Sequence, residues 1–131
     1  MRKPKIYEMR KDGWNDYWEI YVFATCKDMQ RYLREHWIEC ESDTRALVHP
    51  VRGGGLIYAE CYLNEEYLGS GLLSHEMVHV AMAHERKNGF GMNYGQEIGN
   101  DEERLAYFQG DCMAGCVNTL RDNGHIKKEK Y

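Results

Sequence analysis

The first half of the chain has short segments rich in aromatic and β-branched residues, a pattern that predicts β-strands. Residues 5–9 (KIYEM) and 17–25 (YWEIYVFAT) have this composition, and the polar segment 11–13 between them predicts a turn. A different pattern follows at residues 27–39, where apolar side chains recur at helical spacing. Thr25, just before this segment, has the hydroxyl of a typical helix N-cap.

A second pair of apolar segments predicts a β-hairpin. Residues 46–51 (ALVHPV) and 56–63 (LIYAECYL) flank the three consecutive glycines from Gly53 to Gly55. Glycines between two apolar runs are typical of a turn. Since Pro50 has no N–H to donate to a sheet, we expect the strand 46–51 to lie at an edge or to end early.

The second half of the chain predicts two long helices. The first should begin near residue 70 and end at Asn88–Gly89, and its apolar residues cover almost the whole circumference. We therefore expect that helix to be buried on all sides. The second should run over residues 101–122, with Asn100 as N-cap and Glu103 completing a capping box.

Together these elements predict one α+β domain over residues 1–131. We expect an antiparallel or mixed sheet of three or four strands, one N-terminal helix and two packed helices at the end. The net charge of −4 argues against binding by neutralisation of nucleic-acid phosphates. The chain has neither a long apolar run that could span a membrane nor an apolar segment typical of a signal peptide. We therefore expect a cytoplasmic protein that binds neither nucleic acid nor a membrane.

The cysteines fit the same compartment. They are five, an odd number, and no secretion signal accompanies them, so reduced thiols are expected. Cys112 and Cys116 lie one helical turn apart and could bind a metal. Such a pair is weakly specific, and free cysteine is often a small buried hydrophobe, so we expect both thiols in the core.

The strongest chemical signal lies in residues 72–85, LLSHEMVHVAMAHE, where His75, Glu76 and His79 match the pattern H-E-x-x-H. Residues four apart on a helix share one face, so His75 and His79 can bind a single ion. A glutamate beside the pair can accept a proton from a metal-bound water, whose pKa zinc lowers toward about 7. The alternative explanation is two core histidines with ordinary hydrogen bonds. The composition of the chain alone would produce an H-E-x-x-H match by chance with a probability of about 3%.

A resemblance gives the motif a context. The sequence HEMVH, followed by a helix that carries Glu102, Glu103 and Ala106, resembles the gluzincin group of zinc metallopeptidases. The short chain resembles compact stand-alone zincins, akin to the ImmA/IrrE-like proteins found with phages and mobile elements. In that group a glutamate on the second helix completes the zinc site, one turn before a small residue. The resemblance therefore implies Glu103 as the third ligand, with Glu102 as the alternative because it lies four residues before Ala106.

These observations lead to a functional hypothesis. The resemblance implies a Zn²⁺-dependent metallopeptidase in which His75, His79 and Glu103 bind the metal and Glu76 is the general base in peptide-bond hydrolysis. A peptide or protein substrate is expected to lie along the strand near residues 56–63, as an added strand of the sheet. One alternative is a zinc-binding regulatory or docking protein that does not cleave. Another is a metal-free adaptor in which the motif is a coincidence.

Overall fold

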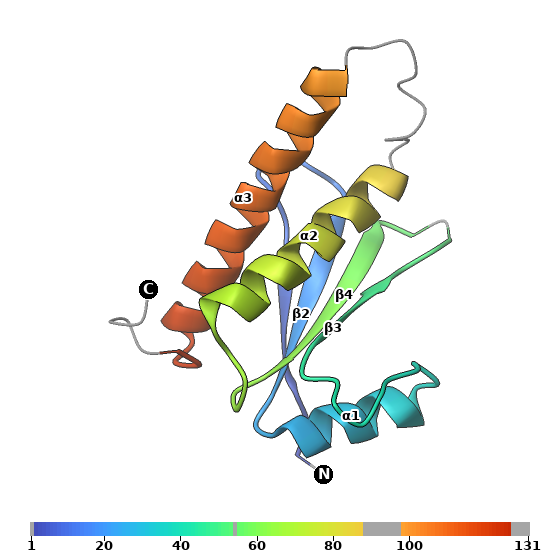
Figure 1. The fold of residues 1–131 in the computed structure, drawn as a ribbon, viewed down its shortest axis with the longest axis vertical. Helices are drawn as coiled ribbons and strands as arrows, with labels where there is room; N and C mark the ends of the chain where they lie inside the picture. Colours follow the sequence, from blue (N-terminus) through green and yellow to red (C-terminus); the bar gives the residue numbers. More distant parts are fainter. Residues whose placement is uncertain (1, 54, 88–97, 127–131) are drawn as a thin grey trace.

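The protein folds into a four-stranded sheet with helices on both faces (Figure 1). A computed structural model describes residues 2–53, 55–87 and 98–126, with only the helical backbone described for residues 98–102. Along the chain, the elements are β1 (Lys5–Met9), β2 (Tyr17–Phe23), α1 (Cys26–Glu35), β3 (Leu47–Pro50), β4 (Ile57–Asn64), α2 (Ser70–Lys87) and α3 (Ile98–Asp122). This architecture confirms the predicted α+β class.

The sheet is mixed, with the strand order β1-β2-β4-β3. Strands β1 and β2 pair antiparallel, β2 and β4 pair parallel, and β3 pairs antiparallel with β4 as the predicted hairpin. The chain crosses from β2 to β4 through α1 and β3, so β4 lies inside the sheet and β3 at its edge. The predicted edge position of Pro50 is thereby confirmed.

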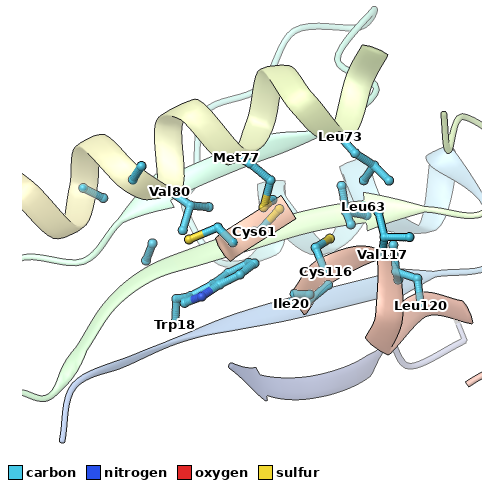
Figure 2. Close-up of a cluster of buried hydrophobic side chains, with 14 of the residues drawn as sticks. Trp18, Ile20, Cys61, Leu63, Leu73, Met77, Val80, Cys116, Val117 and Leu120 are labelled. Carbon is cyan, nitrogen blue, oxygen red and sulfur yellow. The ribbon is translucent and has the colours of Figure 1, made fainter. Parts of the chain in front are cut away.

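Alternation along the strands divides the core between the two faces of the sheet. On one face, Trp18, Ile20 and Val22 of β2 pack with α2 and α3, while Tyr21 and Phe23 on the other face pack with α1. Figure 2 shows the larger cluster, in which residues of β2 and β4 lie against residues of α2 and α3. The labelled residues are Trp18, Ile20, Cys61, Leu63, Leu73, Met77, Val80, Cys116, Val117 and Leu120. The two last helices thus cover the same face of the sheet.

Helix α1 begins as predicted but ends earlier. The Thr25 hydroxyl accepts a hydrogen bond from the Asp28 N–H at 3.1 Å, which confirms the N-cap. The helix ends at Glu35, four residues before the predicted end, because the backbone turns to a positive φ of 60° at Trp37. Helical spacing therefore placed Trp37 wrongly on the apolar face of this helix.

Helix α2 is buried on one side only, so the prediction of all-round burial was wrong. Leu73, Met77 and Val80 are fully buried, whereas His75, Val78 and His79 face solvent. The motif residues therefore separate by helical face, with Glu76 turned inward. The predicted stop of this helix at Asn88–Gly89 lies outside the described residues.

Helix α3 starts at Ile98 rather than at Asp101. Asn100 consequently lies within the helix, so the predicted capping box at Asn100 and Glu103 is wrong. The helix ends at Asp122 as predicted, and Gly124 follows with a φ of 79°. Within the parts of the chain that the structure describes, no helix has the length and apolar character needed to cross a membrane.

A buried polar cluster joins the C-terminal half of α2 to its neighbours. The His84 ring is stacked at 4.9 Å on Trp14, from the β1–β2 connection, and at 4.3 Å on Phe108 of α3. Its nitrogens lie 3.7 Å from carboxylate oxygens of Asp16 and Glu85. Burial lowers the pKa of His84 below its ordinary value of 6.5, and the two carboxylates only partly oppose this effect.

The lowered pKa of His84 makes stability depend on pH. The unfolded chain protonates this ring more readily, so its contribution is fully present above the ordinary pKa and is lost as the pH falls through the folded-state value. We expect the free energy of unfolding to fall more between about pH 7.5 and about pH 5 in the wild type than in His84→Phe, which keeps the ring stacking. Urea denaturation at several pH values measures this difference, and equal losses in the two proteins would contradict it.

Candidate metal centre

The two histidines of the motif lie side by side on the exposed face of α2. Their Nε2 atoms are 3.3 Å apart and their ring planes meet at 73°. Two nitrogens bound to one tetrahedral zinc at about 2.05 Å are themselves separated by about 3.3 Å. The spacing of the two donor atoms therefore fits one tetrahedral ion before any ion is present.

The exposure of the pair changes the reason for expecting a metal. A helix buried on all sides would have required polar partners for His75 and His79, but both rings face solvent. Water can hydrate them, so burial does not require a metal there. A hydrogen bond between two neutral rings, one donating and one accepting, also accounts for the contact, although 3.3 Å exceeds the usual range.

Glu76 is the buried member of the motif. Its side chain is only 7% exposed, and among the described residues none donates a hydrogen bond to it. Burial raises the pKa of this carboxyl group, while His79 and His75 act in the opposite direction. The burial of the side chain disfavours the charged carboxylate, so a polar partner close to the two imidazoles would stabilise Glu76.

Glu103 does not join the pair. Its side chain is exposed, and the adjacent Arg104 pairs at 3.0 Å with Glu85 of α2. Glu85 lies six residues past His79, about 9 Å further along the helix axis. The start of α3 is therefore level with the end of α2 rather than with the motif.

A complete three-ligand site is not assembled within the described part of the chain. No group of three His, Cys, Asp or Glu residues there lies close enough to hold a metal ion. The alternative ligand, Glu102, has a side chain outside the described set. The structure thus brings together His75, His79 and Glu76 and leaves Glu103 apart.

The cysteine pair belongs to the core, as predicted. Cys112 and Cys116 are 6% and 0% exposed and pack against the sheet with α2. Burial raises the pKa of each thiol to about 12, so both stay protonated near neutral pH. Both thiols therefore act as small apolar side chains of the core.

The strand beside the motif was misidentified from the sequence. We expected a substrate to pair with residues 56–63, but β4 is already paired on both sides, with β2 and with β3. It therefore has no free edge along its paired length. The edge strand next to β4 is β3, which the sequence indicated only through Pro50.

The end of β3 lies close to the C-terminal half of α2. Pro50 lines a cavity together with Ala83 of α2, and the strand and helix run in the same direction (Figure 1). Val48 lies two residues before Pro50, about 6.6 Å back along the strand. The same distance along α2 spans between four and five residues, counted back from Ala83. Val48 is therefore about level with His79.

Comparison of the chain with protein-family models, with curated proteins and with solved structures finds no match in any of the three.

The burial of Glu76 predicts an effect on stability. In metal-free protein, Glu76→Gln should raise the free energy of unfolding by about 1 kcal/mol at neutral pH, because an amide carries no charge that partial burial disfavours. Urea denaturation in the presence of a chelator measures the change. The exposed Glu103→Gln serves as the control and should leave stability unaltered; a destabilised Glu76→Gln protein would contradict the prediction.

Proposed function

We propose that the protein is a zinc-dependent peptidase whose metal is held by His75 and His79. The observation that carries the proposal is the 3.3 Å separation of the two Nε2 atoms, which suits a tetrahedral ion, next to the buried carboxylate of Glu76. The resemblance of HEMVH to the gluzincin motif supports the same chemistry.

In this proposal, residues on different faces of α2 have different roles. His75 and His79 face outward and would hold zinc, which supplies a bound water of lowered pKa and an electrophile for a carbonyl oxygen. Glu76, turned toward the core, would act as the general base for such a water and as the proton donor to the departing amine. A raised pKa suits this double role, because the carboxyl must both accept and give up a proton near neutral pH.

The edge of β3 is the proposed substrate track. The Val51 N–H donates to the Tyr58 carbonyl, so by alternation the backbone groups of Val48 and Ala46 point away from β4. An extended peptide could pair with these two residues beside the histidines. Pro50 occupies the next outward position and has no N–H, so the pairing would end there.

The third ligand is proposed from the resemblance. Glu103 is the residue that the motif spacing favours. Its neighbour Glu102 is the alternative that the resemblance leaves open. Gln109 donates to the Ser74 carbonyl of α2 at 3.5 Å, whereas position 103 is about 120° away from that face. Glu103 reaches the pair only if the start of α3 lies closer to the motif.

Loss of the base should separate metal binding from hydrolysis. We expect Glu76→Gln to keep one zinc per chain and to lose at least about 100-fold in peptide hydrolysis, because proton transfer from the water is removed. Elemental analysis measures the zinc, and mass spectrometry of a digested mixture of unstructured peptides measures cleavage.

Ligand variants complete this test. His75→Ala and His79→Ala should lose both zinc and activity, and His36→Ala, an exposed histidine at the end of α1, should keep both. Full activity of Glu76→Gln would refute the mechanism. Zinc binding without cleavage by the wild type would leave the non-cleaving zinc-binding protein as the function.

The two glutamates of α3 can be distinguished by zinc affinity. If Glu103 is the ligand, Glu103→Gln should weaken zinc binding by about 10-fold or more and Glu102→Gln should not. The reverse result would assign the role to Glu102. Competition with a fluorescent chelator gives both affinities, and unchanged binding in both variants would exclude a ligand from this turn.

A further inference from the structure

Trp37 is the most exposed large apolar residue of the described chain. Its side chain is 94% exposed, whereas Trp18 is only 4% exposed and lies in the core. Trp37 follows the last turn of α1, where the Ile38 N–H donates to the Leu33 carbonyl at 2.9 Å. This hydrogen bond closes the end of the helix and fixes the position of Trp37.

The backbone of Trp37 is in the left-handed region, with φ at 60°. That position after a helix is normally taken by glycine, because a side chain there costs about 1 kcal/mol. A tryptophan here is unfavourable for folding in two ways, since it holds a strained backbone and leaves a large apolar surface in water. Its burial against another molecule would offset both costs.

A groove lies directly beside Trp37. It has a volume of about 670 Å³ and runs from the end of α1 to the start of the edge strand β3. Ile38 and Leu47, both half-buried, contribute apolar surface to it. The remaining lining residues are Arg34, Trp37, Glu39, Cys40, Glu41 and Thr44. The groove therefore combines apolar surface with an exposed aromatic ring.

The rim of the groove is acidic. The loop 38–44 carries Glu39, Glu41 and Asp43 and contains no Lys, Arg or His. All three carboxylates are exposed, and none of them forms an ion pair with another described residue. Arg34 is the one basic residue in the lining. The surface around Trp37 thus has acidic side chains that no described residue pairs with.

We propose that Trp37 and this groove bind an extended segment of a partner protein in which lysine or arginine residues alternate with aliphatic ones. Aliphatic side chains fit against Ile38 and Leu47. A basic side chain can lie on the indole face, where cation–π attraction is strongest. Other basic side chains pair with the free carboxylates of the loop. An extended conformation follows from the position of the groove, which leads to the open edge of β3.

The test uses two blocked peptides and the metal-free protein, so the result does not depend on hydrolysis. One peptide alternates Lys with Leu, and the other has Glu in place of each Lys. Isothermal titration calorimetry should show binding of the lysine peptide only, weakening as salt is added because the pairs are exposed. Trp37→Gly should weaken binding by about tenfold or more without lowering the free energy of unfolding, since glycine relieves the backbone strain.

Charge reversal tests the acidic rim of the groove. The double variant Glu39→Lys and Glu41→Lys should abolish binding of the lysine peptide. Asp12→Lys changes the charge of the turn between β1 and β2, which does not line the groove, and should leave binding unchanged. Equal affinity for the two peptides, no binding of the lysine peptide, or unaltered binding by Trp37→Gly would each overturn the proposal.

Discussion

The packing of one face of α2 against the sheet is the constraint on which the candidate site depends. Leu73, Met77 and Val80 are buried against β2 and β4, and this contact sets the rotation of the helix about its axis. Once that rotation is fixed, residues 75 and 79 must face outward together and residue 76 must face inward. The separation of exposed imidazoles from a buried carboxylate is therefore a direct result of core packing rather than of any bound ligand.

Local patterns in the sequence predicted the elements well. The strands β1 and β2, the hairpin of β3 and β4 and the Thr25 cap all follow from alternation, glycine position and side-chain chemistry within a few residues. These features depend on neighbours in the chain. The α+β class follows from the same information, because strands come first and the long helices last.

The features that the sequence did not predict depend on contacts between distant segments of the chain. Apolar residues around α2 suggested burial on every side, yet only tertiary packing decides which of them face the sheet, and Val78 remains 46% exposed. We expected residues 56–63 to form an edge strand, but β3 lies at the edge instead. After β2 the chain continues through α1 and β3 before β4 pairs with β2, so β4 lies between β2 and β3. The position of Glu103 relative to the motif depends on how α3 packs along α2, which no spacing in the sequence reveals, so its role as a ligand stays a prediction.

Pro50 has an additional consequence for the behaviour of the protein at high concentration. An unpaired strand edge is a template on which further copies of a chain can assemble into extended ribbons. The ring of Pro50 interrupts the outward row of donors on β3 after Val48, and so the edge is too short to propagate such growth. The same residue that limits how far a peptide can pair with β3 also protects this side of the sheet from aggregation.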